Sequence, residues 1–378
     1  MFTLLKGVKV VSAAWMYPGP YCTMLLADMG AEVIIVERPG VGDLTRLDPF
    51  FFEAINRNKK SMTVNLQSEK GKEICHKLVQ KSDVFLDGFR PGVAQKLGMD
   101  YPTLERLNPA LIYVSISGYG QDGPYANWPG HDLSYQGVVG MLAQHEAREA
   151  EALLPPVAIA DLSSGMFATV GILAALHHKS ETGQGMYIDV SMVDGLISWM
   201  TVPLTIYLNS GLTSRSREPA YGIFKARDGR CLTLSIAYED HFWSNLCHLL
   251  GRSDLASMPR EERISRKEEL VALLKETFLS KTRDEWVQIL TSGNVAAGPV
   301  YDYSEVVNDP HLKHRNLFIE IEKAEKKVKE IGSPLKFLSP YQQKDLYPPE
   351  LGEHNEEILS ILGYTEKQIE EFRRDGVI

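Results

Sequence analysis

The sequence predicts an α/β protein in which a large domain with a doubly wound parallel sheet is combined with a smaller α+β domain. From the N-terminus to about residue 120, short apolar runs alternate with amphipathic stretches, the pattern of strands joined by crossover helices. The chain has 378 residues, more than one ordinary core accommodates. Near residues 209–219 the composition shifts toward Asn, Ser, Gly, Thr and Arg, which predicts a linker between two domains.

The first part of the large domain is predicted to alternate strands with helices. Each predicted strand is a short, largely apolar run, and each predicted helix carries apolar side chains at helical spacing. Gly30 ends the first helix, as glycine commonly does. The predicted strands are 8–12, 32–37, 61–66, 84–86 and 111–116, and the predicted helices are 21–29, 69–81 and 93–97.

The remainder divides into the end of the large domain, the small domain and a returning tail. We assign 1–208 to the large Rossmann-like domain, 209–219 to the linker, 220–315 to the small domain and 316–378 to a segment that returns to the large domain. The elements predicted there are helices 161–176, 192–207, 239–250, 266–280, 283–291 and 354–362, strands 186–190 and 318–323, and a strand pair around 228–229.

Composition excludes several classes of protein. The net charge is −9, which argues against broad nucleic-acid binding but leaves room for a local basic pocket. The four cysteines are widely spaced, without metal-ligand spacing, as in reduced cytosolic proteins. The N-terminus lacks the layout of a signal peptide, and we read no apolar run as long enough to span a bilayer. We therefore expect a cytoplasmic protein that binds neither membranes nor nucleic acid and holds no metal.

The turn after the first strand argues against a dinucleotide cofactor. It reads Ala-Ala-Trp-Met-Tyr-Pro-Gly-Pro over residues 13–20 and has no GxGxxG pattern. Two prolines in this turn would remove N–H groups that a pyrophosphate needs. No P-loop, HExxH or GxSxG motif is present either. Redox use of the sheet and serine hydrolysis are therefore not supported.

Asp161 lies where an apolar extended run meets an apolar helix. A carboxylate leaves water there only at a cost unless it is paired or hydrogen-bonded. From position alone, the commoner explanation is an N-cap of the following helix, whose oxygen accepts backbone N–H groups. The alternative is a nucleophile or proton carrier held on a rigid seam.

Basic side chains occur in loops that follow or precede the predicted strands. Each alone is more often a solvated surface charge, but several together could hold the phosphates of a nucleotide-like ligand. These residues are Arg38, Arg57, Lys59, Lys60, Arg90 and Lys96.

Two further titratable residues are candidates for proton transfer. His131 follows a glycine-rich loop, and imidazole titrates near neutral pH, although a loop histidine is usually structural or solvated. Glu239 stands near the start of a predicted helix, where an acidic residue complements the helix dipole without any catalytic role.

Many segments, in order along nearly the whole chain, resemble the class III CoA-transferases of the CaiB/BaiF type, a family that includes formyl-CoA transferase, carnitine CoA-transferase and α-methylacyl-CoA racemase. The resemblance implies a Rossmann-like large domain without the nucleotide fingerprint, a small domain, and a homodimer of two interlocked chains. The matching segments are 19–33, 36–40, 56–61, 89–92, 111–118, 182–185, 297–300 and 352–354.

The same resemblance implies coenzyme A, as acyl-CoA, for the substrate, with no tightly bound cofactor. The family's phosphate and adenine contacts would fall on Arg38, Phe89 and Lys96, with Arg90 beside them in the same loop. Carboxylic acids would be the second substrate. The family places the acyl-CoA where domains and subunits meet.

Three functions remain open. In the transferases, the aspartate matched by Asp161 attacks the thioester and carries first the acyl group and then CoA. In the racemases, a histidine and this aspartate act on one side of the substrate and a glutamate on the other, at positions matching His131, Asp161 and Glu239. The third possibility is a CoA-binding protein without catalysis. We expect CoA transfer, and we expect His131 to reach Asp161 by a hydrogen bond, directly or through one water.

Overall fold

The computed structural model describes residues 4–142, 156–213, 218–337 and 345–378. These residues form two compact units, one of residues 1–205 with 316–378 and one of residues 206–315. Residues 214–217 of the predicted linker, and residues 153–155 of the run before Asp161, lie outside the described part.

The first unit is built on a six-stranded sheet in the order β3-β2-β1-β4-β5-β6. All neighbouring strands in it pair in parallel. The strand order reverses between β1 and β4, so a crevice opens beyond the carboxyl ends of these two strands. The strands are β1 (Lys9–Ala13), β2 (Glu32–Glu37), β3 (Lys59–Thr63), β4 (Val84–Asp87), β5 (Ile112–Ser117) and β6 (Met186–Ser191).

Helices cover both faces of this sheet, which confirms the predicted doubly wound arrangement. Alternate residues of β1 enter different cores, because Val11 packs in one buried cluster and Val10 in the other. The first cluster includes side chains of α3 (Glu69–Gln80), α5 (Tyr101–Leu107), α16 (Asn355–Ile361) and α17 (Glu366–Arg374). The second includes side chains of α1 (Pro18–Asp28), α2 (Pro49–Asn56) and α7 (Ile159–Thr182).

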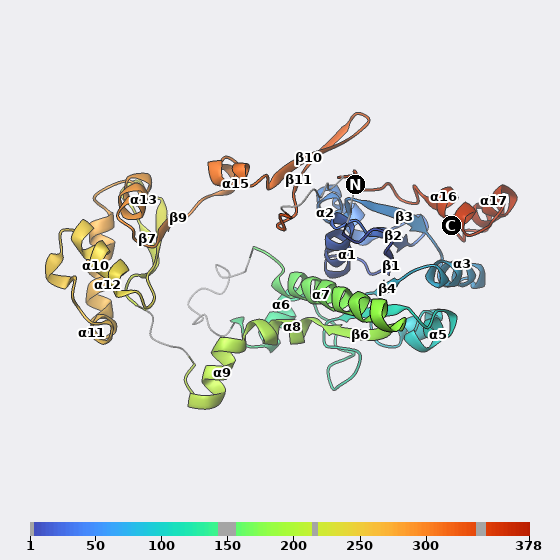
Figure 1. Cartoon of the computed structure of the whole chain (residues 1–378), viewed down its shortest axis with the longest axis horizontal. Helices are drawn as coiled ribbons and strands as arrows, with labels where there is room; N and C mark the ends of the chain where they lie inside the picture. Colours follow the sequence, from blue (N-terminus) through green and yellow to red (C-terminus); the bar gives the residue numbers. More distant parts are fainter. Residues whose placement is uncertain (1–3, 143–155, 214–217, 338–344) are drawn as a thin grey trace. The chain divides into compact units, whose positions relative to one another are not determined.

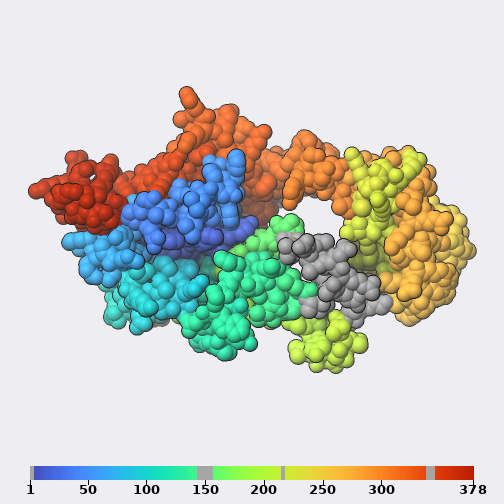
Figure 2. Space-filling model, turned by 180° about the vertical axis from the view of Figure 1, so that it is seen from behind, coloured from blue at the N-terminus to red at the C-terminus, as the bar shows by residue number. Residues whose placement is uncertain are grey.

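The C-terminal segment packs against the N-terminal part of the chain. Figure 1 shows α16 and α17 beside α3, and Figure 2 shows the red C-terminal surface lying against the blue surface of the first strands and helices. Asn355 joins the edge strand β3, because its side chain accepts the N–H of Thr63 at 2.9 Å and donates to the Thr63 hydroxyl at 2.7 Å. Ser61 N–H donates to His354 Nδ1 at 3.2 Å. The exposed edge of the sheet is thereby covered.

The other elements of the first unit connect or extend the sheet. They are a 3-10 turn, three short helices, and an antiparallel hairpin that precedes the C-terminal helices. These elements are the 3-10 turn Leu44–Leu47, α4 (Val93–Leu97), α6 (Asp132–Val138), α8 (Met192–Trp199), β10 (Phe318–Lys323) and β11 (Lys326–Ile331).

The predicted helix 192–207 is divided in the structure. α8 ends at Trp199, and α9 (Thr201–Ser210) follows after Met200. Pro203, in the first turn of α9, has no N–H to continue a hydrogen-bond ladder, which explains a break just before it.

The second unit is an α+β structure with its own core. A three-stranded antiparallel sheet, in the order β7-β8-β9, is covered by helices through Trp243, Leu274 and Trp286. Its elements are β7 (Tyr221–Lys225), β8 (Cys231–Ser235), β9 (Ala297–Pro299), α10 (Asp240–Leu249), the 3-10 turn Ser253–Leu255, α11 (Arg260–Ser265), α12 (Lys267–Phe278), α13 (Arg283–Ser292), α14 (Tyr303–Val306) and α15 (Pro310–His314).

Helix α7 corrects one statement made from the sequence. By length and composition alone, its 24 residues are apolar enough to cross a membrane, contrary to our interpretation of the apolar runs. Such a test is weak for a single helix, because core helices of soluble proteins also pass it. Ala168, Ile172 and Ala175 of α7 are buried in the second core cluster, so the apolar character has a structural explanation.

Candidate active site

A pocket lies in the crevice where the strand order reverses. The segment after β1 forms one wall and the residue after β4 another, as expected for the switch point of an α/β sheet. Asp161 and His131 both line this pocket. The full lining is Ala14, Trp15, Met16, Pro18, Gly19, Gly88, Ile116, Gly130, His131, Tyr135, Asp161 and Met192.

Asp161 is in the first turn of α7 but does not cap it. The helix begins at Ile159, two residues earlier than predicted, with Ala158 at the N-cap position and no side-chain cap there. Leu162 N–H donates to Ala158 O at 3.0 Å, so this amide is already bonded within the helix. The prediction that Asp161 caps the helix is therefore wrong, and its carboxyl group remains for the pocket.

The capping function belongs to Asp132 on α6. Its Oδ1 accepts the N–H of Ala160 at 2.6 Å, across 28 residues of sequence. A carboxylate at this position satisfies one of the amides that a helix start leaves without a partner. The sequence offered no local sign of this bond, because the donor and the acceptor belong to different helices.

Burial, together with the smaller effect of the negative charge of Asp132, raises the pKa of Asp161 from 3.8 to about 7. The start of a helix normally favours a carboxylate, which lowers its pKa, so desolvation outweighs the dipole here. A carboxyl group that titrates near neutral pH is populated both as carboxylate and as acid. It can therefore serve as nucleophile, base or acid under working conditions.

His131 immediately precedes α6 and is exposed at the pocket. Within the described ranges, no direct hydrogen bond or ion pair joins its ring to Asp161, so the direct form of the predicted contact is absent. A contact through one water remains a prediction. The two titratable groups therefore line one pocket from two different elements.

Tyr135 fixes the loop that carries His131. Its hydroxyl donates to Gly130 O at 2.7 Å, and the ring is buried. A Cβ on Gly130 would lie 2.8 Å from this ring, and one on Gly118 would lie 2.4 Å from its hydroxyl oxygen. Burial also raises the pKa of Tyr135 to about 12, so the phenol keeps its proton. These two glycines are needed for space beside the tyrosine.

Met16 shows local strain in the pocket wall. Its φ is 70°, in the left-handed region that side chains other than glycine rarely adopt. Its N–H donates to the Asp43 carboxylate, at 3.0 Å to the nearer oxygen, and Asp43 also caps the following 3-10 turn. Sequence reasoning assigned no function to Met16 or Asp43, and strained backbone next to a titratable pair is typical of functional sites.

Cations predicted to bind phosphate follow the carboxyl ends of β2 and β4, the two strands on either side of β1. Arg38 directly follows β2, Arg90 comes three residues after β4, and Lys96 is on α4. All three side chains are exposed, and among the described residues none makes a hydrogen bond or ion pair with the protein. The charge of Arg90 reaches the pocket, since it acts to lower the pKa of Tyr135 against the larger effect of burial.

Asp87, the last residue of β4, holds the loop containing Phe89 and Arg90. Its carboxylate accepts the N–H of Phe89 at 2.9 Å, the hydroxyl of Tyr113 at 2.6 Å and the hydroxyl of Ser115 at 3.1 Å. Burial raises the pKa of Asp87 to about 6. The sequence contained a signal for this contact, because an aspartate two residues before an amide commonly forms such a turn.

Arg57, Lys59 and Lys60 lie apart from Arg38, Arg90 and Lys96, which we call the cationic rim. This corrects the sequence-based grouping of all six residues. They stand at the start of β3, the opposite end from its carboxyl edge. Arg57 is buried between Asp28 and Glu330, at 2.6 and 2.9 Å. Lys59 is also buried, with its pKa lowered to about 7 by desolvation, and its ammonium donates to three oxygens of the protein.

Glu239 belongs to the second unit, whereas Asp161 and His131 belong to the first. It stands at the N-cap position of α10, and its carboxylate accepts the N–H groups of Ala237 and Tyr238 at 3.1 and 2.9 Å. These bonds, with that of Ala237 first, lower its pKa. A carboxylate stabilised in this way is a weak base at neutral pH.

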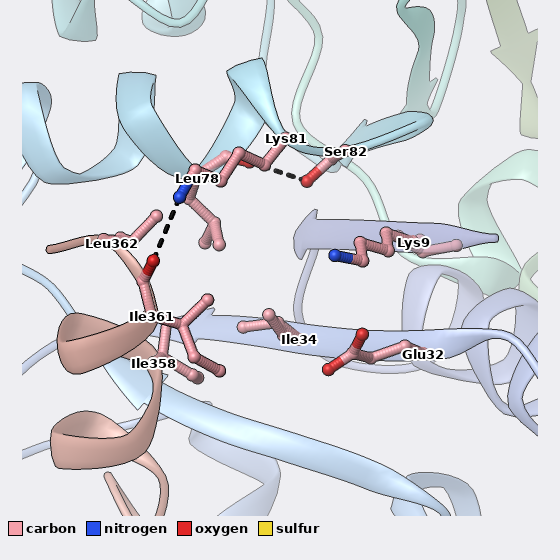
Figure 3. Close-up of a pocket in the computed structure, with 10 residues that line it drawn as sticks. Lys9, Glu32, Ile34, Leu78, Lys81, Ser82, Ile358, Ile361 and Leu362 are labelled. Carbon is pink, nitrogen blue, oxygen red and sulfur yellow. Dashed lines mark hydrogen bonds between the residues drawn. The ribbon is translucent and has the colours of Figure 1, made fainter. Parts of the chain in front are cut away.

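A second hollow lies at the opposite, amino-terminal edge of the sheet (Figure 3). Ile34, Leu78 and Ile358 give it an apolar lining. Its nearby polar groups bond within the protein, because Lys81 Nζ donates to Ile361 O at 2.9 Å and the Ser82 hydroxyl to Leu78 O at 2.7 Å. We therefore regard this hollow as part of the packing interface between α16 and the sheet.

In the described part of the chain, no group of acidic, histidine or cysteine side chains could hold a metal ion.

Together, the doubly wound sheet, the switch-point pocket and its titratable carboxyl group are those of an α/β enzyme without a dinucleotide-binding loop. The model of CoA-transferase family III matches residues 5–355, and the chain belongs to this family. This family contains CoA-transferases and a racemase of acyl-CoA, so the protein is an enzyme that acts on acyl-CoA.

Similar proteins include both transferases and a racemase. An acyl-CoA transferase of Fusarium pseudograminearum (strain CS3096) is 32% identical over 99% of this chain and 88% of its own. The succinyl-CoA:glutarate CoA-transferase of Homo sapiens is 30% identical over 99% and 90%, respectively. The alpha-methylacyl-CoA racemase of Homo sapiens is 32% identical over 99% and 97%.

A solved structure of a CAIB/BAIF family protein from Brucella suis superposes with a TM-score of 0.84. The two sequences are 32% identical, and the match covers 96% of this chain and all of the other. The family recognised from the sequence is therefore confirmed, together with the mixed α/β fold.

Proposed function

We propose that the protein moves CoA from an acyl-CoA to a second carboxylic acid, with Asp161 as the covalent nucleophile. The observation that carries this proposal is the position of the Asp161 carboxyl group, which lines the switch-point pocket and titrates near neutral pH. A partly desolvated carboxylate is a stronger nucleophile than a hydrated one. Most of the similar proteins above are named as CoA-transferases, which supports the same reaction.

In the proposed reaction, each step breaks one bond to an acyl carbon and forms another. The Asp161 carboxylate attacks the thioester carbonyl carbon and the C–S bond breaks. CoA leaves as the thiolate, and the donor acyl group stays on Asp161 as a mixed anhydride. The thiolate attacks the aspartyl carbonyl carbon, which releases the donor acid and leaves an aspartyl-CoA thioester. The acceptor carboxylate attacks this thioester and displaces the thiolate, which then takes the acceptor acyl group and regenerates Asp161. The steps are comparable in difficulty, because thioesters and anhydrides are similarly reactive.

We propose that Arg38, Arg90 and Lys96 hold the CoA phosphates, with Phe89 against the adenine, and that no tightly bound cofactor takes part. Arg90→Ala should then raise the KM for acyl-CoA by about 10-fold with little change in kcat, since a charge-assisted phosphate contact contributes to binding in ground and transition states alike. Arg106→Ala, an exposed arginine of α5, is the matched control. An unchanged KM in Arg90→Ala would remove this residue from the phosphate site.

The transfer proposal is tested with succinyl-CoA and a panel of carboxylic acids. New CoA esters should form only when an acceptor is present, and they should vanish in Asp161→Ala. Denatured enzyme from a stalled reaction should carry CoA on the peptide containing Asp161, as measured by mass spectrometry. Asp122→Asn, an exposed aspartate, serves as control. Transfer that persists in Asp161→Ala would disprove the nucleophile.

The second candidate function is racemisation of an α-methylacyl-CoA. The observation that favours it is that His131 and Asp161 line one pocket without a direct bond between them. Two separate acid–base groups could remove and return the α-proton, which the thioester acidifies. Glu239 is the weaker of the three predicted participants, because backbone bonds lower its pKa.

Deuterated water separates the remaining possibilities. Deuterium that enters the α-carbon of an α-methyl-branched acyl-CoA without an acceptor acid would identify a racemase and disprove transfer as the main activity. His131→Gln should abolish that exchange. Absence of both reactions, with CoA binding retained in calorimetry, would identify a CoA-binding protein.

We propose a cytoplasmic homodimer of interlocked chains. Helices α7 and α8 expose large apolar side chains that a partner chain would cover, among them Met166, Val170, Ile197 and Trp199. Light scattering after gel filtration should give twice the mass of the 42.3 kDa chain. Interlocked chains should also exchange subunits only when they unfold. When tagged and untagged dimers are combined under native conditions, no dimer with one tagged and one untagged chain should therefore form.

A further inference from the structure

We propose that Asp132 is a positioning residue that fixes the spacing between His131 and Asp161. Its carboxylate takes the place of the missing side-chain cap of α7, and so holds the first turn of that helix against the first turn of α6. This inference rests on the proposed role of Asp161 and adds a residue that has no role in the sequence-based prediction.

The two oxygens of Asp132 bond to two different elements. Oδ1 accepts the Ala160 N–H at 2.6 Å, one residue before Asp161. Oδ2 accepts the side-chain amide of Gln136 at 2.5 Å, one turn along α6. Asp132 itself directly follows His131. The carboxylate therefore connects a residue adjacent to each titratable group, and its loss would let the two helix starts separate.

The buried end of this connection is Gln136. Its side chain is fully buried, and its Oε1 has no hydrogen-bond partner within the described ranges. A buried amide that bonds through one end only is held less firmly than one bonded at both ends. The free Gln136 Oε1 also allows Asp132→Asn to be tested without loss of the contact, because the Gln136 amide can rotate and accept a hydrogen bond from the asparagine.

The charge of Asp132 has a separate effect from its hydrogen bonds. It acts with burial to raise the pKa of Asp161. Among the described residues, the other titratable groups near Asp161 are His131 and Tyr135 on the α6 side and Tyr17 before α1. Burial is the main cause that raises the pKa of both tyrosines, and the charge of Asp161 adds to it. On α8 and β6, Asp194 and Asp189 add further negative charge to the elements packed against α7. Among the described residues, Asp132 is the charged group that raises the pKa of Asp161 alongside burial.

Asp132→Asn separates charge from position. The asparagine oxygen can still accept the Ala160 N–H, and its amide can donate to the rotated Gln136 Oε1. Maximal kcat and the KM for acyl-CoA should change by less than about 3-fold, while the low-pH limb of the kcat/KM profile should move to lower pH. An unmoved limb would overturn the effect of charge.

Asp132→Ala removes the bonds as well. We expect kcat to fall by about 10- to 100-fold with little change in the KM for acyl-CoA, because small displacements of reacting groups are costly. Ser68→Ala, which removes the side-chain cap of α3 on the opposite face of the sheet, is the control for lost stability alone. Equal kcat losses in Asp132→Ala and Ser68→Ala, or in Asp132→Ala and Asp132→Asn, would overturn the positioning role.

A titration without substrate distinguishes this inference from the proposed function. With aspartate labelled at the carboxyl carbon, NMR follows Asp161, and the signal absent from Asp161→Asn identifies it. The midpoint should fall in Asp132→Asn relative to the unmodified protein. If the protein turned over no acyl-CoA, the function proposal would fail while this measurement still decided the effect of Asp132; an unchanged midpoint would overturn that effect even in an active enzyme.

Discussion

At the scale of single residues, the unusual property of Asp161 is that folding makes its ionisation harder. Desolvation, with the charge of Asp132, raises its pKa from 3.8 to about 7, so between these pH values the folded protein binds a proton that the unfolded chain has released. Between these two values, each rise in pH therefore favours the unfolded state. A carboxyl group whose pKa is raised in this way lowers the free energy of unfolding at neutral pH, and such groups are typical of active sites.

Asp161→Asn should consequently stabilise the protein at neutral and alkaline pH. The gain should be absent below pH 4, grow between pH 4 and 7, and stay constant above pH 7 at about 2 kcal/mol, less than the full pKa difference implies because the carboxyl is partly exposed. Urea unfolding at pH 4, 6 and 8 measures it. Asp122→Asn should show no such trend, and a gain independent of pH would contradict the raised pKa.

Gly130, which lies against the ring of Tyr135, is a second residue whose substitution should affect activity. In Gly130→Ala the new Cβ would lie 2.8 Å from the tyrosine ring, so the ring or the His131 backbone must move, and kcat should fall by about 10-fold. Gly137→Ala, in α6, meets nothing within 4 Å and should instead stabilise the protein by about 0.5–1 kcal/mol. Steady-state kinetics and thermal unfolding of both variants test this contrast.

At the scale of elements, a buried ion-pair group joins α1, the start of β3 and the β10–β11 hairpin. Arg57 contacts Asp28 of α1 and Glu330 of β11, and all three side chains are almost fully buried. A buried group of this kind contributes less to net stability than its contacts suggest, but removing one member leaves unpaired charges in the interior.

Arg57→Ala should therefore destabilise the protein by about 3–5 kcal/mol. Lys60→Ala, its neighbour with partly exposed pairs to Glu32 and Glu357, should cost less than about 1 kcal/mol. Denaturant unfolding measures both. Neither substitution should change the KM for acyl-CoA in the protein that remains folded; a raised KM in Lys60→Ala would restore this cluster to the phosphate site.

Local patterns predicted the elements better than the site. β2, α4 and β10 were predicted to the residue, because an apolar run between two glutamates, flanking glycines and apolar alternation mark their respective ends. The amphipathic helix α17 was missed although Thr365 and Gln368 form a capping box in the sequence. β11 was missed because its lysines and glutamate hide the alternation of Val328 with its neighbours. Such errors could be corrected by a closer reading of local signals.

The errors at the site have a different cause. Asp161 was expected to cap its own helix, whereas the capping carboxylate comes from Asp132, 28 residues before its partner. The basic residues at 57–60 were grouped with the possible phosphate contacts, but they stand where the chain enters β3, at the end opposite to the carboxyl edge. Both depend on contacts between segments far apart in sequence, which propensity and spacing do not encode.

At the scale of the whole molecule, the first unit is assembled from both ends of the chain. Residues 316–378 complete the core begun by residues 1–205. Ile358 and Leu359 of α16 are buried against the sheet, and Asn65 N–H donates to Val377 O at 2.8 Å. The unit that holds the pocket therefore depends on its C-terminal helices for stability.

Ile358→Ala and Ile361→Ala form a matched pair on α16. Ile358 is 3% exposed, and its truncation should destabilise the first unit by about 2–4 kcal/mol through lost burial and a cavity. Ile361 is 57% exposed, and its truncation should cost less than about 0.5 kcal/mol. Unfolding followed by a probe in the first unit should show this difference; equal effects would mean that α16 does not contribute to the core.

The order of synthesis gives this discontinuous arrangement a further consequence. A ribosome makes residues 206–315 before the last helices of the first unit, so the compact second unit can fold while the first sheet still lacks its cover. During that interval the edge strand β3 and the apolar face that α16 and α17 later cover stay open to other nascent chains. Chaperone dependence should therefore be greatest in the last stage of translation, and should be relieved when Asn355 reaches Thr63 and closes the edge.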